Sequence, residues 1–163
     1  MSGSTLPAPA ADLAQAMLGI WKLTTRIDLD ASGQRRIDPA LGADPLGVLC
    51  FAPGYFAAQF MRRDRSTAPG TAPAAPGTAP VMAPSLNNSV AVDGYDAYFG
   101  TYVLDPGAGT IATTLDASVS PANIGKTFVR RVRVVDAQLI IQLDTTAADG
   151  AAVTRTLRFS RLS

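Results

Sequence analysis

Residues 126–144 read KTFVRRVRVVDAQLIIQLD, and this stretch decides the fold. Apolar side chains alternate with other residues over 126–135 and again over 138–144, which is the period of a strand with one buried face. Asp136-Ala137 interrupts the alternation, so a tight turn is expected there. The stretch therefore predicts an antiparallel hairpin in an all-β protein.

The same pattern continues on both sides of this hairpin. Six further strands are predicted, separated at intervals of roughly ten residues by turn formers such as Pro53-Gly54 and Asp149-Gly150. Eight antiparallel strands joined mostly by short turns can close into an up-and-down barrel, which has no exposed edge and holds filling side chains or one small ligand. A two-sheet sandwich is the alternative. The six strands cover residues 19–28, 46–52, 55–62, 97–104, 110–117 and 152–162.

The length of 163 residues suits one domain with a substantial core. Residues 1–18 are interpreted as an N-terminal extension with a short helix, and residues 19–163 as the single barrel domain. Within it, residues 63–85 are a low-complexity loop rich in Pro, Ala and Gly, because frequent Pro removes ladder hydrogen bonds. Its segment 67–80 is either a lid over the barrel mouth or a tolerated surface insertion.

The composition excludes several kinds of chemistry. The chain has no His, and all 13 acidic residues are Asp, so His-based triads and His-rich metal centres are excluded, and we expect no metal and no cofactor. A net charge of +1 argues against nucleic-acid binding. The single Cys50 cannot form an internal disulfide, and no segment resembles a secretory signal or a membrane span. We therefore expect a cytoplasmic bacterial protein without a membrane partner, with a homodimer as one possible assembly.

Gly19-Ile-Trp-Lys-Leu23 on the first strand resembles the Gly-x-Trp signature of lipocalins and related calycin barrels. This resemblance implies a lipocalin-like barrel in which Trp21 packs near the closed end against an Arg of the last strand, here Arg161, through a structural cation–π contact. Where many relatives carry His in the strand after the turn, this sequence has Thr110-Ile-Ala-Thr-Thr114, which puts His-dependent chemistry in doubt. Together with the Gly-x-Trp stretch, further segments resemble the small bacterial and fungal lipocalin-like domain family from Gly19 to Arg161: residues 41–47, 51–54, 58–65, 97–102 and 120–125.

Arg130 is the main candidate for a binding residue. Strict alternation puts it on the apolar face of its strand with Phe128 and Val132. A guanidinium inside a barrel needs an anion or several acceptors, because burying it unpaired is costly. It is predicted to anchor a carboxylate, enolate or carbonyl oxygen of a ligand. The alternatives are an internal ion pair with an Asp such as Asp116, or a bulge that turns Arg130 outward.

Tyr98 and Tyr102 share one face of a strand, with Gly100 between them. A flat ligand could approach the backbone at the glycine, and the two rings would offer apolar bodies with hydrogen-bonding tips. Ordinary filling of the barrel is the alternative. Gln59 and Thr113 are further polar candidates for the cavity.

The leading functional prediction is binding of a small hydrophobic, flat metabolite in the barrel cavity, oriented by Arg130, Tyr98 and Tyr102. The alternative is a cofactor-free isomerase, cyclase or dehydratase of secondary metabolism acting on a polyketide-like molecule in the same cavity. Its candidate catalytic residues are Arg130, Tyr98, Tyr102 and Asp116. A buried, unpaired Asp beside the pocket would favour the enzyme. A third possibility is a filled barrel that works through its surface.

Overall fold

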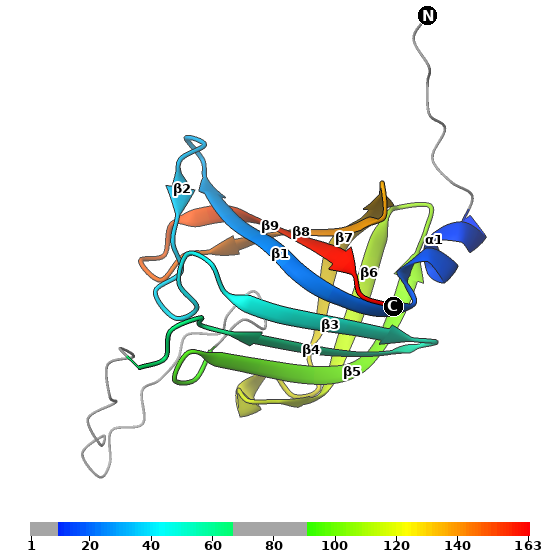
Figure 1. Cartoon of the computed structure of the whole chain (residues 1–163), viewed down its shortest axis with the longest axis horizontal. Helices are drawn as coiled ribbons and strands as arrows, with labels where there is room; N and C mark the ends of the chain where they lie inside the picture. Colours follow the sequence, from blue (N-terminus) through cyan, green and yellow to red (C-terminus); the bar gives the residue numbers. More distant parts are fainter. Residues whose placement is uncertain (1–9, 67–90) are drawn as a thin grey trace, which may run out of the picture.

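The structure, a computed structural model, describes residues 10–66 and 91–163 and forms one antiparallel sheet rolled into a barrel (Figure 1). The predicted loop over 63–85 lies outside the described residues from position 67 onward. The elements are α1 (Ala10–Met17), β1 (Gly19–Asp30), β2 (Arg35–Arg36), β3 (Leu46–Ala52), β4 (Tyr55–Met61), β5 (Tyr95–Asp105), β6 (Thr110–Ser118), a 3₁₀ turn η1 (Pro121–Asn123), β7 (Thr127–Val135), β8 (Gln138–Thr146) and β9 (Ala152–Arg161).

The barrel closes through the pairing of its first and last long strands. β1 runs antiparallel to β9 from Trp21 opposite Arg161 to Asp30 opposite Val153. From β3 to β9 each strand pairs with the next in the chain, and β3 also pairs with β1. The predicted eight-stranded barrel is therefore confirmed and the sandwich alternative is wrong. The two-residue strand β2, which pairs with the end of β1, was not predicted because two residues carry no periodicity.

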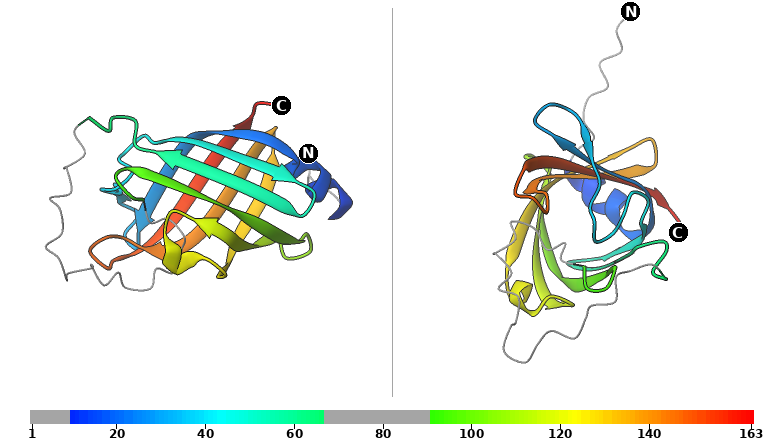
Figure 2. Two further views of the ribbon diagram at one scale, coloured as in Figure 1. Left: turned by 90° about the horizontal axis from the view of Figure 1, so that it is seen from below. Right: turned by 90° about the vertical axis from the view of Figure 1, so that its left-hand side faces the viewer.

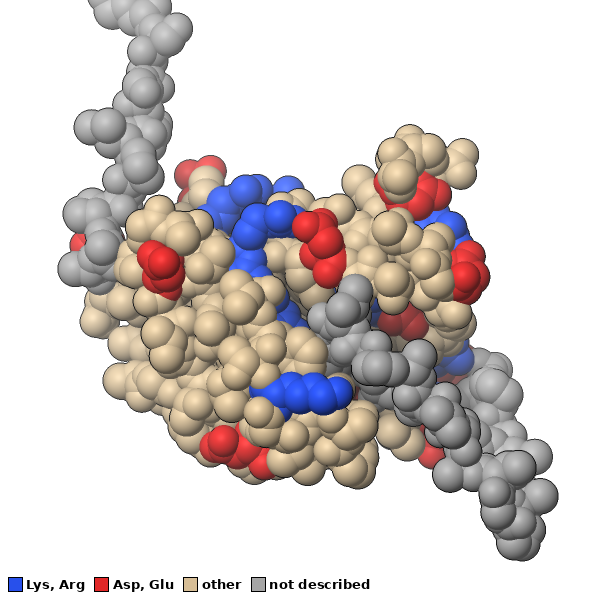
Figure 3. All heavy atoms as spheres, turned by 180° about the vertical axis from the view of Figure 1, so that it is seen from behind, with Lys and Arg blue, Asp and Glu red and all other residues tan. Residues whose placement is uncertain are grey.

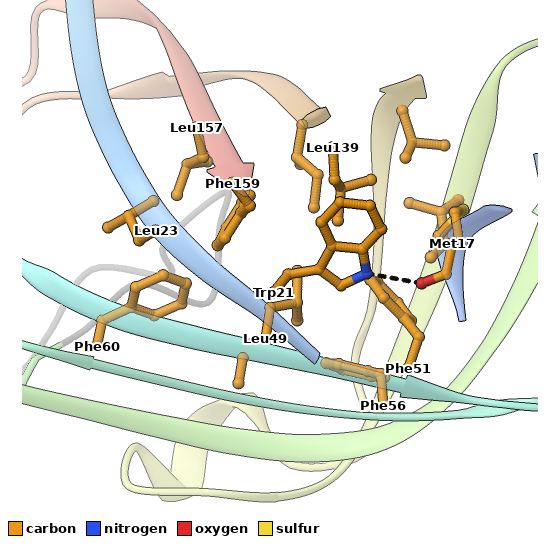
Figure 4. Close-up of a cluster of buried hydrophobic side chains, with 14 of the residues drawn as sticks. Met17, Trp21, Leu23, Leu49, Phe51, Phe56, Phe60, Leu139, Leu157 and Phe159 are labelled. Atoms are coloured by element: carbon orange, nitrogen blue, oxygen red, sulfur yellow. Dashed lines mark hydrogen bonds between the residues drawn. The ribbon is translucent and has the colours of Figure 1, made fainter. Parts of the chain in front are cut away.

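Helix α1 lies across one end of the barrel (Figure 2). Trp21, fully buried beneath it, donates its indole N–H to the carbonyl oxygen of Met17 at 2.8 Å (Figure 4). The Arg161 guanidinium carbon lies 4.2 Å from the centroid of the Trp21 ring, and Arg161 also donates to the carbonyl oxygen of Leu18 at 2.5 Å. The contact that the family resemblance implied is present, and it joins the helix, the first strand and the last strand at this closed end.

One extra residue in β1 changes which side chains face the interior. Leu23 pairs with Phe159, but Thr25 pairs with Arg158, so Thr24 is a β-bulge; its hydroxyl donates to the Arg158 carbonyl at 3.0 Å. A bulge inverts the alternation beyond it. Uninterrupted alternation along β1 would put Thr25 and Ile27 inside and Arg26 and Asp28 outside, but the bulge reverses these positions. Arg26 and Asp28 are the buried residues, with 7% and 6% of their surface exposed.

The outer surface carries charges of both signs. On the face shown in Figure 3, Lys and Arg form separate patches beside Asp side chains on a largely uncharged surface. An ion pair joins two neighbouring strands, with Arg131 Nη2 of β7 at 3.3 Å from Asp144 Oδ1 of β8. No helix in the described part of the chain is long and apolar enough to cross a membrane.

Candidate functional site

The middle of the barrel holds a small cavity with a volume of about 40 Å³. Its wall is mostly aromatic and aliphatic, with Arg130, Thr113 and Tyr98 as the polar residues. Phe60 and Phe159 face each other across the interior with ring centroids 6.4 Å apart (Figure 4). The remaining wall residues are Leu49, Phe51, Phe56, Ile111, Ile141 and Leu157.

Arg130 points into this cavity from β7. The pairings of β7 with β6 and β8 run without a register shift, so the predicted alternation holds and no bulge turns Arg130 outward. Its Nη1 donates to the Thr113 hydroxyl at 3.1 Å, and Thr113 donates in turn to the carbonyl oxygen of Phe128 at 3.2 Å. Burial lowers the pKa of the Arg130 guanidinium from its usual value. A cation in a mostly apolar wall attracts the negative or polar end of a ligand.

Tyr98 and Tyr102 take different positions. Tyr98 lines the cavity and packs against Phe56 and Phe60, with ring centroids 6.0 and 6.3 Å away. Tyr102 lies edge-on against Phe51 at 5.2 Å, nearer the closed end, and does not line the cavity. The predicted pair is thus divided, with Tyr98 in the cavity wall and Tyr102 against Phe51 nearer the closed end.

Two other candidates lie on the outside of the barrel. Gln59 is exposed and accepts a hydrogen bond from the Tyr95 hydroxyl at 2.8 Å. Asp116 is exposed and accepts one from the Tyr55 hydroxyl at 2.6 Å. Phe99 pairs with Ala117 and Gly100 with Leu115, so Asp116 is the extra residue of a second bulge. Asp116 follows the buried Leu115 and faces outward, so it does not reach the cavity or pair with Arg130, and Gln59 does not contribute to the cavity wall.

Gly100 makes this second bulge possible. A Cβ atom at this position would lie 2.0 Å from the carbonyl oxygen of Thr114, far inside van der Waals contact. The glycine that was interpreted as room for a flat ligand instead admits the backbone of the neighbouring strand.

A buried ion pair lies at the opposite end from α1, where β1 ends and β5 begins; we call this end the mouth. Arg155 of β9 binds Asp28 of β1 with two hydrogen bonds of 2.8 Å each, from Nε and Nη2. Only 4% of the surface of Arg155 is exposed. Such a bidentate pair tolerates burial because each charge is met by its partner at close range.

A second ion pair connects the barrel interior to the loop after β2. Arg26 Nη2 donates to Asp38 Oδ2 at 2.6 Å, and Asp38 Oδ1 accepts the backbone N–H of Ala40 at 2.7 Å. Burial alone would raise the pKa of Asp38, but the charge and hydrogen bond of Arg26 hold that pKa below its usual value. Burial and the nearby charge of Arg155 lower the pKa of Arg26. Asp38 Oδ2 is also 3.8 Å from Arg155 Nη2, so the two pairs form one cluster.

Asp96 is the buried acid that the sequence analysis did not select. It is fully buried on the interior face of β5, and neither carboxyl oxygen has a hydrogen-bond partner in the structure of residues 10–66 and 91–163. Burial raises its pKa to about 7, although the charges of Arg26 and Arg155 act in the opposite direction. Asp96 lies two residues before Tyr98, so strict alternation from Tyr98 would have predicted an inward side chain at this position.

The chain matches the family model described as the lipocalin-like domain over residues 18–161. It therefore belongs to the lipocalin-like domain family, as the closed barrel and the Trp21–Arg161 contact also indicate. No curated protein sequence matches it. A barrel of this family is consistent with the binding of a small molecule in its interior.

Proposed function

We propose that the barrel binds a small, flat, hydrophobic metabolite and that Arg130 holds its polar end. The observation that carries this proposal is the Arg130 guanidinium in the wall of a mostly apolar cavity. Apolar walls supply affinity, while a few polar groups fix orientation. A carboxylate, an enolate or a carbonyl oxygen suits a guanidinium that already donates to Thr113.

The two ends of the barrel favour entry from the mouth. Helix α1, Trp21 and Arg161 occupy the closed end. The aromatic rings of Phe56, Phe60 and Tyr98 pack against one another in the cavity wall, so a planar ring system can pack against them. A flat ligand would then extend from the aromatic wall toward Arg130.

The test is the affinity of naphthoate and of naphthalene, measured by isothermal titration calorimetry for the wild type and for Arg130→Met. Naphthoate is expected to bind the wild type, and Arg130→Met to weaken it by about 10-fold or more, because a hydrogen bond to a charged group contributes about 1.5–3 kcal/mol. Naphthalene should bind both proteins equally. Arg131→Met is the matched control, since Arg131 is the next residue and faces outward.

Equal naphthoate affinity in the wild type and Arg130→Met would contradict the role of Arg130. If neither probe binds the wild type, a filled barrel that works through its surface becomes the better interpretation. A cytoplasmic location and a homodimer stay predictions from the sequence.

A further inference from the structure

Asp96 lies between the aromatic cavity and the charged cluster at the mouth. On β5 it faces the interior two residues before Tyr98, and on β4 its direct neighbour across the sheet is Phe60. Both neighbours line the cavity. Residues two apart on a strand are separated by roughly 7 Å, so Asp96 stands one layer above Tyr98 toward the mouth. A ligand that entered from the mouth and packed against Phe60 and Tyr98 would contact this layer.

The charged groups around Asp96 come from every side of the barrel. Arg26 of β1, Arg155 of β9 and Arg130 of β7 act on it as positive charges, and Asp38 of the loop after β2 acts as a negative one. Arg26 and Arg155 are engaged by Asp38 and Asp28. The net electrostatic potential of these neighbours at Asp96 is therefore positive. Neither carboxyl oxygen of Asp96 accepts a hydrogen bond from the described residues, and the lack of one is unusual for a fully buried carboxyl.

Resting on the ligand site proposed above, we propose that Asp96 transfers protons on the bound molecule while Arg130 stabilises the oxygen that gains negative charge. The barrel would then be a cofactor-free isomerase whose substrates are flat, apolar ketones with an acidic hydrogen beside the carbonyl.

The reaction needs no co-reactant. The ionised Asp96 removes a proton from the carbon next to the carbonyl, and the C–H electron pair forms a carbon–carbon double bond while the carbonyl π electrons move onto oxygen. The Arg130 guanidinium stabilises the resulting enolate oxygen by charge and hydrogen bonding. The protonated Asp96 then returns its proton to the same carbon or, in an unsaturated ketone, to the far end of the conjugated system, which moves the double bond. Asp96 ends ionised, as it began.

The titration of Asp96 suits this role. A base that works near neutral pH is most effective when its own pKa lies near the operating pH, and burial raises the pKa of Asp96 to about 7. An unperturbed Asp, with a pKa near 3.9, would be a much weaker base.

The experiment measures deuterium incorporation beside the carbonyl of β-tetralone, a flat apolar ketone, by NMR in heavy water with the full chain. Wild-type protein should accelerate exchange over buffer, and Asp96→Asn should reduce the protein-dependent rate by about 100-fold, the smaller end of what general base catalysis contributes. Asp144→Asn is the matched control and should exchange at the wild-type rate, because Asp144 is exposed on the outside of β8. Circular dichroism of each variant verifies the fold.

A second readout does not depend on any variant. Ionised Asp96 is the active form, so the wild-type rate should rise as pH increases through about 7 and then level off. A rate that follows the buffer reaction at every pH would overturn the proposal.

Binding and exchange distinguish the two proposals. If β-tetralone binds wild type and Asp96→Asn equally but neither accelerates exchange, the proton-transfer proposal fails and the binding proposal survives. If Asp96→Asn loses binding and exchange together, Asp96 anchors the ligand and the proton-transfer proposal is overturned. If no ketone or naphthoate binds the wild type, the binding proposal itself fails.

Discussion

The two ends of the barrel are built from the same strands but have opposite interiors. At the closed end, Trp21 is buried among apolar side chains, and its one polar hydrogen is donated to Met17. At the mouth, the interior holds Arg26, Asp28 and Arg155, each with 7% or less of its surface exposed. Strand β1 contributes to both ends, and the bulge at Thr24 lies between them.

The interior of the closed end and the interior of the mouth make different contributions to the stability of the fold. The closed end combines apolar burial with satisfied hydrogen bonds, an arrangement that stabilises a fold. The mouth places charges in the interior, where desolvation opposes folding, and leaves Asp96 without a partner in the described structure. Residues that cost stability are expected where a binding or reacting site requires them. This contrast is why the proposed site lies at the mouth layer and the adjacent cavity.

The largest expected effect comes from breaking the ion cluster. Arg155→Met leaves Asp28 buried without its bidentate partner and should lower the free energy of unfolding by about 3–5 kcal/mol. Urea denaturation at neutral pH measures the loss. Arg158→Met on the outward face of the same strand is the control and should cost less than about 1 kcal/mol. Equal losses of unfolding free energy for the two variants would mean that the buried ion pair is no more important for stability than an arginine on the outer face.

The next effect concerns Asp96 and has the opposite sign. Because burial raises its folded-state pKa from 3.8 to about 7, the wild type should lose stability as pH rises from about 4 to about 7. Asp96→Asn removes this loss, so it should be more stable than wild type by roughly 2–4 kcal/mol above pH 7 and gain nothing in acid. Thermal or urea unfolding across this pH range measures it. An Asp96→Asn protein that is less stable than wild type at high pH would refute the assignment.

The closed end should respond less to a conservative change. Trp21→Phe keeps an aromatic ring but loses the hydrogen bond to Met17 and weakens the stacking of Arg161, for a cost of about 1–2 kcal/mol. Circular dichroism follows the unfolding, and a double-mutant cycle with Arg161→Met isolates the stacking contribution. An unchanged unfolding midpoint would show that the closed end does not depend on these contacts.

The smallest effect is expected outside the barrel. Arg131 and Asp144 form an ion pair on the exposed face, where water and salt screen it. Arg131→Ala should change the free energy of unfolding by less than about 1 kcal/mol, and added salt should reduce even that difference. A loss of unfolding free energy as large as that of Arg155→Met would show that exposed and buried ion pairs contribute equally to stability.

The barrel and the inward position of Arg130 followed from the sequence, because period-two alternation and turn residues are local signals. The contact of Trp21 with Arg161 followed only from the resemblance to lipocalins. The site was only partly predictable. Arg130, Tyr98 and Thr113 line the cavity, whereas Asp116 and Gln59 lie outside and Tyr102 packs nearer the closed end.

Only the tertiary structure decided what faces the mouth. A bulge depends on how a strand pairs with its neighbour, and it inverts every side chain beyond it, so nothing in the sequence of β1 alone indicates that Arg26 and Asp28 turn inward at Thr24. Asp116 also lies on the outside, directly after the buried Leu115. Asp38 reaches Arg26 only because its loop packs on the barrel, and the pKa of Asp96 depends on burial by residues distant in the chain. The alternation of side chains can be read from one strand, but which charged side chains face the interior at the mouth depends on the register between strands.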